Sequence, residues 1–140
     1  MEYLEEVKAF AWKHGYTETL LGRRREVPLL KSPLPFLRAQ GERIAINAPI
    51  QGTSADILKL AMLDAHEFLK KEDLLGKAKL VLQIHDAILV EAPVAKRMAV
   101  AQSMQQTMLM PIAINHRSLT VPVDVSMSAA SWGKMSEIKL

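Results

Sequence analysis

The sequence has 140 residues, enough for one compact domain, and 49% of them are apolar while 24% are charged, the balance of an ordinary folded protein. The net charge of +3 is too small to require a nucleic-acid partner by itself. The absence of cysteine excludes disulfide frameworks, thiolate zinc sites, iron–sulfur clusters and cysteine nucleophiles.

No apolar run approaches the roughly 20 residues that a membrane span needs. Residues 1–6 are acidic, which does not suit a secretion signal or a transit peptide. We therefore expect a soluble, intracellular protein in the cytoplasm.

The chain begins with a predicted helix and a predicted hairpin. Apolar residues recur at helical spacing over residues 2–14, and Gly15 is a natural stop signal. Residues 16–27 place β-prone runs on both sides of a Leu-Gly pair, which indicates a short hairpin. A proline-rich loop follows, with Pro28, Pro33 and Pro35.

Two helices are predicted next, over residues 36–47 and 53–70. Pro49 separates them, because proline lacks the N–H group that a helix interior uses. Thr53 with Asp56 three residues later resembles a capping box, which places the start of the second helix at Thr53.

A tight strand pair is predicted after these helices. Residues 80–84 and 88–90 are dense β-branched and aliphatic runs, separated by only three residues. Two buried strands joined this closely form a hairpin, with His85 and Asp86 at its tip.

The remaining sequence predicts a helix over residues 94–110, a strand over residues 119–125 and a tail that contains Trp132. Because strands pair locally while helices fall between them, the fold class is predicted to be α+β, with helices packed on a small antiparallel sheet.

Asp86 is the carboxylate whose setting is most suggestive of chemistry. Apolar strands lead into and out of it, so its backbone is held at the tip. Mg²⁺ tolerates little distortion and usually takes one or two protein carboxylates, which makes Asp86 a candidate ligand. An ordinary turn residue is the alternative, and spacing alone favours it. For His85 the same two interpretations remain: a residue of a functional site, or a structural residue.

Arg43, Asn47 and Gln51 are spaced by four, which places them in a row on one face of a continuous helix. Such donors can contact base edges in a DNA minor groove and a phosphate. A polar solvent face is the alternative, and Pro49 disturbs the geometry.

The triplet at residues 23–25 consists of three arginines, whose planar guanidinium groups suit phosphates. A solvated charge run explains the triplet as well, and the triplet alone favours that interpretation. Glycine-rich phosphate loops and a nucleophile elbow are absent from the sequence.

Several segments together resemble bacterial DNA polymerase I enzymes of family A. Residues 42–56, ERIAINAPIQGTSAD, resemble a signature of that family, and residues 82–86, LQIHD, resemble the start of its third palm motif. Residues 15–25 resemble the hairpin that precedes them, while residues 121–125 and Trp132 fit the carboxyl end.

The resemblance implies the carboxyl-terminal part of a DNA-directed DNA polymerase, with the end of the fingers in residues 1–35 and much of the palm in residues 36–140. Such a nucleotidyltransferase serves DNA replication and repair. Its expected partners are primer–template DNA, deoxynucleoside triphosphates and the missing amino-terminal part of the polymerase.

The resemblance also assigns roles. Asp86 would be a catalytic Mg²⁺ ligand in a two-metal phosphoryl transfer to the primer 3′ end, and His85 would lie near the primer terminus and contact DNA. Arg43, Asn47 and Gln51 would bind template and primer through the minor groove.

Two departures from the family pattern qualify these roles. The third motif usually continues with Glu, where this sequence has Ala87, which we expect to weaken or retune the site. The family's other metal-binding Asp and the Lys and Arg that hold the triphosphate lie upstream of this sequence. We therefore expect the isolated chain to be inactive.

Two alternatives stay open. The chain could be a non-catalytic DNA-binding module derived from a polymerase palm, with Ala87 as the trace of lost chemistry. It could also be an interaction or structural domain that binds no nucleic acid, in which case it would lack the salt-dependent DNA affinity that phosphate contacts produce.

Overall fold

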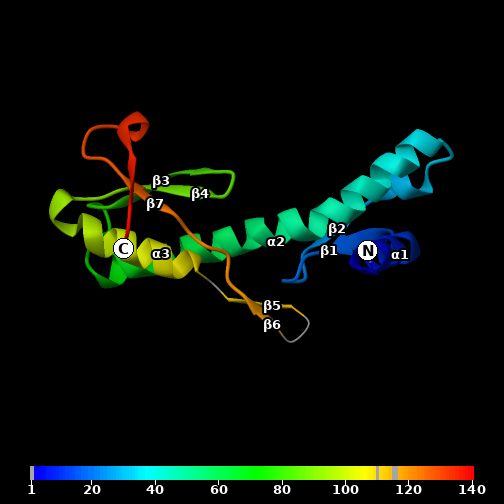
Figure 1. Cartoon of the computed structure of the whole chain (residues 1–140), viewed down its shortest axis with the longest axis horizontal. Helices are drawn as coiled ribbons and strands as arrows, with labels where there is room; N and C mark the ends of the chain where they lie inside the picture. Colours follow the sequence, from blue (N-terminus) through cyan, green and yellow to red (C-terminus); the bar gives the residue numbers. More distant parts are fainter. Residues whose placement is uncertain (1, 110, 115–116) are drawn as a thin grey trace. The chain divides into compact units, whose positions relative to one another are not determined.

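The computed structural model describes residues 2–109, 111–114 and 117–140, and within them helices alternate with short strand pairs (Figure 1). The α-helices are α1 (Glu2–His14), α2 (Pro35–Lys71) and α3 (Arg97–Met108), and the 3₁₀ helices are η1 (Pro28–Lys31), η2 (Val94–Lys96) and η3 (Trp132–Lys134). None of the helices in these ranges is long and apolar enough to span a membrane. The chain divides into two compact units, Met1–Asp56 and Ile57–Leu140. The predicted boundary between fingers and palm after residue 35 stays a prediction.

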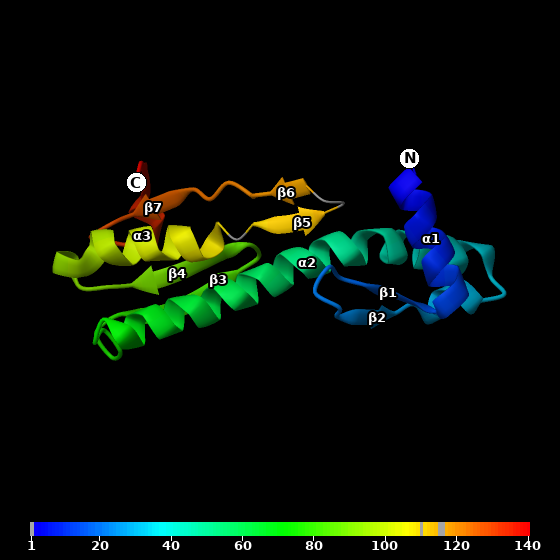
Figure 2. The ribbon, with the colours of Figure 1, turned by 90° about the horizontal axis from the view of Figure 1, so that it is seen from below.

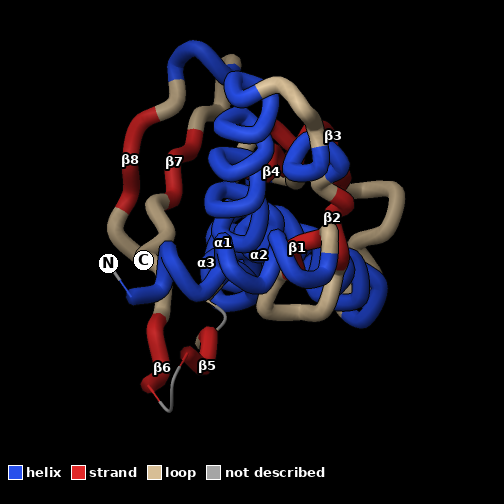
Figure 3. Tube along the Cα trace, turned by 90° about the vertical axis from the view of Figure 1, so that its right-hand side faces the viewer, coloured by secondary structure: helices blue, strands red, loops and turns tan. Residues whose placement is uncertain are grey.

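The strands of the described ranges form separate two-stranded antiparallel sheets (Figure 3). The pairs are β1 (Tyr16–Glu18) with β2 (Arg24–Glu26), β3 (Lys79–Ile84) with β4 (Ala87–Glu91), β5 (Ile112–Ile114) with β6 (Arg117–Leu119), and β7 (Val125–Met127) with β8 (Ser136–Ile138). This mixture of helices and small antiparallel sheets confirms the predicted α+β class.

The first unit has a small apolar core where α1, the end of the β1–β2 hairpin, η1 and α2 meet. Its buried members are Ala11, Val27, Leu30 and Ala45. The predicted helix over residues 2–14 and the predicted hairpin are both confirmed, and Gly15 adopts the positive φ of 80° that its stop role requires.

The prediction of two helices separated at Pro49 is wrong, because α2 runs without a break from Pro35 to Lys71. Its first residue is a proline, which is favourable at that position. Pro49 lies inside the helix and is buried, so tertiary packing maintains the helix where local propensity opposes it.

The predicted capping box is also wrong, because Thr53 and Asp56 lie in the interior of α2. The Thr53 hydroxyl donates to the Pro49 carbonyl at 2.6 Å, which is a bond within the helix rather than a cap. Asp56 bonds to the β1–β2 hairpin instead.

The second unit packs α3 and the carboxyl-terminal part of α2 against the β3–β4 hairpin (Figures 1 and 2). Its buried residues are Ala65, Leu69, Leu74, Ala78, Val100 and Met104, with Leu80, Ile88 and Val90 of the hairpin packed against them. This core anchors the hairpin, whose tip carries His85 and Asp86.

The end of the chain differs from prediction in two places. The single strand expected over residues 119–125 is wrong: β6 ends at Leu119 and β7 begins at Val125. Pro122 lies in the gap, where it could not donate a ladder hydrogen bond. The helix expected over residues 94–110 is observed as η2 followed by α3, and its expected last residue, Met110, lies outside the described residues.

Gly41 tests the packing of the first unit, because a Cβ added there would lie 2.9 Å from the Leu30 backbone nitrogen. In an open helix, Gly→Ala stabilises by about 1 kcal/mol. Here we expect Gly41→Ala to lower the free energy of unfolding by about 1–3 kcal/mol, because the backbone of η1 must move. Chemical denaturation, monitored by amide hydrogen exchange in the first unit, measures this change in the free energy of unfolding.

Gly133→Ala is the matched control, since a Cβ there meets nothing within 4 Å, and it should leave stability nearly unchanged. A stabilising Gly41→Ala would contradict the packing described for α2 against η1.

Candidate functional site

The β3–β4 hairpin turns through His85 and Asp86, as predicted. Ile84 pairs with Ala87 directly across the turn, so the loop contains only two residues. His85 adopts a positive φ of 50°, and its carbonyl accepts a 2.8 Å hydrogen bond from the Gln83 side chain. Both tip side chains are exposed.

This turn fixes the backbone that carries the Asp86 carboxylate. A non-glycine residue in the left-handed region costs on the order of 1 kcal/mol, and such residues cluster at functional sites. The hairpin ladder and the apolar core of the second unit hold His85 in that conformation. An exposed carboxylate on a rigid turn can serve as a ligand of a hard cation.

The carboxylate of Asp86 is not part of a ready-made metal centre. Within residues 2–109, 111–114 and 117–140, no group of three or more His, Asp or Glu side chains could hold a metal ion. Among the described residues, Asp86 is the candidate ligand at this tip.

The helical row is present as a structural feature. Arg43, Asn47 and Gln51 all lie on the continuous helix α2, and all three side chains are exposed. Their spacing places them along one face, and Pro49 does not end the helix between Asn47 and Gln51.

The β1–β2 hairpin is joined to α2 by a buried carboxylate. Asp56 accepts a 2.8 Å hydrogen bond from the Thr19 hydroxyl and a 2.6 Å hydrogen bond from Arg23 Nε. The side chain of Asp56 is only 11% exposed, whereas that of Arg23 is 47% exposed. The Thr19 hydroxyl also accepts from the Arg23 backbone N–H. We call Asp56, Arg23 and Thr19 the Asp56 clamp.

Two further hydrogen bonds join the hairpin to α2 close to Gln51. Arg23 Nη2 donates to the Gly52 carbonyl at 3.0 Å, and the Leu20 backbone N–H donates to the Thr53 hydroxyl at 3.0 Å. Gly52 permits this close approach, because a Cβ there would lie 2.5 Å from Thr19 Cγ2. The hairpin therefore contacts α2 at the two residues that follow Gln51.

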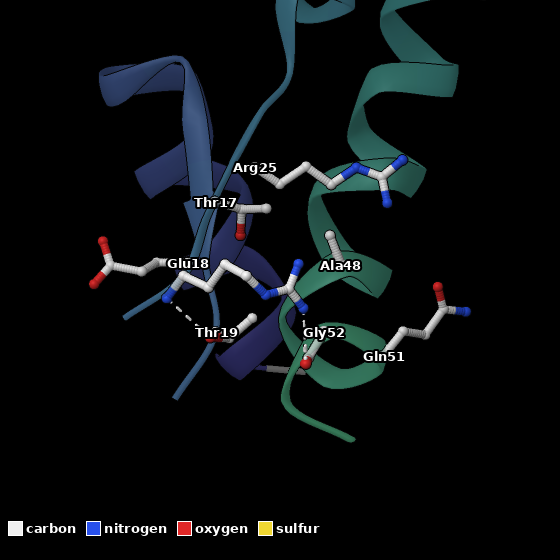
Figure 4. A pocket seen from close by; sticks show the side chains of 8 residues that line it. Thr17, Glu18, Thr19, Arg25, Ala48, Gln51 and Gly52 are labelled. Atoms are coloured by element: carbon white, nitrogen blue, oxygen red, sulfur yellow. Dashed lines mark hydrogen bonds between the residues drawn. The ribbon is translucent and has the colours of Figure 1, made fainter. Parts of the chain in front are cut away.

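A pocket of about 180 Å³ lies between the hairpin and this part of α2 (Figure 4). Hairpin residues Thr17, Glu18, Thr19, Arg23 and Arg25 line one side, and Ala48, Gln51 and Gly52 line the other. Gln51, one member of the row, therefore borders a polar pocket whose wall is the β1–β2 hairpin.

The three arginines of the triplet make different contacts. Arg23 belongs to the Asp56 clamp. Arg24 pairs with Glu18 at 3.0 Å and lies over the Tyr16 ring, 4.6 Å from its centroid. Arg25 lines the pocket. The interpretation as a simple solvated run therefore fails for Arg23, whereas the Arg24 side chain stays 62% exposed in its pair with Glu18. Phosphate binding by the triplet stays a prediction.

The structure brings the predicted site residues together in two groups. Arg43, Asn47 and Gln51 belong to the first unit, and His85 and Asp86 to the second. The Asp56 clamp was missed from the sequence. Gly52 is the sequence feature that could have indicated the clamp, because a glycine within a helix can mark a place where another segment packs closely against the helix. Nothing in the sequence identifies that other segment.

The comparisons with known proteins agree on one family. The family described as DNA polymerase family A matches residues 1–134. The chain is 37% identical over 139 residues to DNA polymerase I of Chloroflexus aurantiacus, covering 99% of this chain and 14% of the relative. It is 46% identical over 106 residues to DNA polymerase I of Deinococcus radiodurans, covering 76% and 11%.

A solved structure has the same fold over most of the chain. It is the POL domain of Pol1 from M. smegmatis in complex with DNA primer-template and dNTP, with a TM-score of 0.73 and 40% sequence identity. The similarity covers 77% of this chain and 19% of that chain. The sequence therefore spans only a small fraction of the proteins that it matches.

Gly52→Ala tests the contact between hairpin and helix. The added Cβ would clash with Thr19 Cγ2, a buried and branched side chain, so we expect a loss of about 1–3 kcal/mol in the free energy of unfolding despite the better helix propensity of alanine. Thermal and urea unfolding measure it.

Thr19→Ser removes the clashing methyl group and keeps the hydroxyl that donates to Asp56. The double variant should therefore be more stable than Gly52→Ala alone. Equal or greater destabilisation in the double variant would contradict the contact.

Proposed function

This chain belongs to DNA polymerase family A, and we propose that it forms the carboxyl-terminal catalytic part of a DNA-directed DNA polymerase. Joined to its missing amino-terminal part, it would add deoxynucleotides to a primer 3′ end. The observation that carries this proposal is the two-residue turn that exposes His85 and Asp86 on an anchored hairpin. The similar M. smegmatis polymerase domain is in complex with DNA primer-template and dNTP, which supports the same partners for this chain.

Asp86 is the residue proposed to hold Mg²⁺. Its carboxylate is a hard oxygen ligand, it is exposed, and its backbone is fixed by the hairpin, all of which fit the needs of that ion. Bound metal of this kind activates the attacking oxygen and stabilises the leaving group in phosphoryl transfer. A second carboxylate from the missing part would complete the site.

His85 is proposed to contact the primer terminus. It precedes Asp86 in the same turn, so the conformation that fixes one residue also fixes the other. Its exposed imidazole can donate or accept a hydrogen bond at the primer end.

Arg43, Asn47 and Gln51 are proposed to bind the primer–template duplex. Their donors lie along one exposed face of α2, and minor-groove acceptors occupy similar positions in every correctly paired base pair. Contacts of this kind check the geometry of a pair without reading its sequence, as copying requires.

Ala87 replaces the glutamate that usually follows His-Asp in this family. It pairs with Ile84 beside the turn and is exposed, so the methyl group leaves the hairpin intact but provides no ligand. We propose a functional site with weaker or altered metal binding. We also propose that the polymerase acts in DNA replication and repair and that it is located in the cytoplasm.

We expect the 140-residue chain alone to extend no primer, because one carboxylate cannot hold the two metals of the reaction. A primer-extension assay with Mg²⁺ and all four deoxynucleotides measures this. The positive control is a chimera in which residues 1–134 replace the matching segment of the Chloroflexus aurantiacus relative. Templated extension by the isolated chain would contradict the expectation.

In that chimera, Asp86→Ala should reduce the extension rate on the order of 1,000-fold while leaving DNA affinity largely unchanged, because the carboxylate acts on the metal and not on the duplex. Single-turnover extension and DNA-binding titrations separate the two effects. Asp64→Ala, an exposed aspartate on α2, is the matched control. Little change on Asp86→Ala would favour the non-catalytic DNA-binding alternative.

A further inference from the structure

Gln51 lies at the weakest part of a long helix. Pro49 precedes it by two residues and removes one backbone N–H bond from α2, while Gly52 follows it directly. Proline and glycine are the two residues that most weaken a helix interior. Without support from outside the helix, this segment would be the first part of α2 to open or to change its rotation.

The β1–β2 hairpin provides such support. Arg23 reaches α2 at two points, with Nε on Asp56 and Nη2 on the Gly52 carbonyl, while Leu20 donates its backbone N–H to Thr53. The contacts therefore fall on three helix residues that follow Gln51 within about one and a half turns.

The chemistry of these contacts favours one fixed geometry. Asp56, with a side chain only 11% exposed, accepts from both Thr19 and Arg23, and hydrogen bonds to a charged group are stronger than neutral ones. A planar guanidinium that bonds two acceptors at once also fixes direction, which a lysine ammonium would not do.

Gln51 itself takes no part in these bonds. Its exposed side chain borders the pocket, whose lining also includes Thr17 and Arg25 of the hairpin (Figure 4). The clamp therefore fixes the helix that carries Gln51 and leaves the amide free for a ligand.

We propose that the Asp56 clamp is a positioning unit: it sets the rotation of α2 at Gln51 and thereby the ability of the row to distinguish a paired primer end from a mismatched one. Asp56, Arg23 and Thr19 act through Gln51 and need not touch DNA. The DNA part of this inference rests on the proposed function, whereas the helix-positioning part does not.

The test uses the 140-residue chain and two readouts. The first is backbone amide hydrogen exchange at residues 51–53 in the free chain, measured by NMR. The second is the ratio of affinities for duplexes with paired and mismatched primer ends. The variants are Asp56→Asn, which removes the charge, and Arg23→Lys, which keeps the charge but loses the two-point contact. Val27→Ala, in the core of the same unit, is the control for general destabilisation.

For both clamp variants we expect exchange at residues 51–53 to accelerate by about tenfold or more, beyond any change in global stability. The affinity ratio should fall toward one. In a Gln51→Ala background, the clamp variants should lower the ratio no further. Val27→Ala should lower the unfolding midpoint and leave the ratio unchanged.

Unchanged local exchange at residues 51–53 in a folded clamp variant would overturn the proposal, as would an affinity ratio that responds to Val27→Ala in the same way. If Asp56→Asn does not fold, Arg23→Lys decides the question. The Arg23 side chain is half exposed, so its replacement should leave the protein folded. If the wild-type chain binds no duplex, the proposed DNA binding by this chain fails, while the exchange measurement still decides the role of the clamp.

Discussion

A buried carboxylate, Asp56, is the centre of the hydrogen bonds that join the β1–β2 hairpin to α2. The Asp56 carboxylate accepts hydrogen bonds from the Thr19 hydroxyl and from Arg23 Nε. The same arginine donates a hydrogen bond to the backbone carbonyl of Gly52. Breaking this contact would leave a largely buried charge without its main cation, an outcome that folded proteins avoid. The exposed row on α2 depends on it, because the hairpin supports the helix where Pro49 has removed part of its own hydrogen bonding.

In the second unit, too, buried groups hold the backbone of an exposed side chain in place. The Asp86 carboxylate is exposed, and its placement comes from the hairpin ladder and from the apolar core that α2 and α3 form beneath the strands. His85 takes a backbone conformation that few side chains adopt. In both units, an exposed polar side chain with a proposed role lies on backbone that buried groups hold in place.

Local patterns predicted the elements whose causes are local. The helix over residues 2–14 follows from its apolar spacing, and the hairpin around His85 follows from two apolar runs with almost nothing between them. The continuity of α2 could not be predicted, because it depends on packing that overrides the preference of Pro49. The partners of Asp56 lie 33 and 37 residues away, so no local motif identifies them, and the capping interpretation of Thr53 and Asp56 was the reasonable but wrong local answer.

The proposed role of Asp86 is to hold a catalytic metal in the joined polymerase. Iron-directed cleavage checks this role. Fe²⁺ replaces Mg²⁺ in the chimera bound to primer–template DNA, ascorbate and peroxide generate hydroxyl radicals, and the cut sites are mapped by mass spectrometry. We expect cleavage between residues 84 and 87, which added Mg²⁺ should suppress and Asp86→Ala should abolish. Cleavage confined to other parts of the chain, or unchanged by Asp86→Ala, would contradict it.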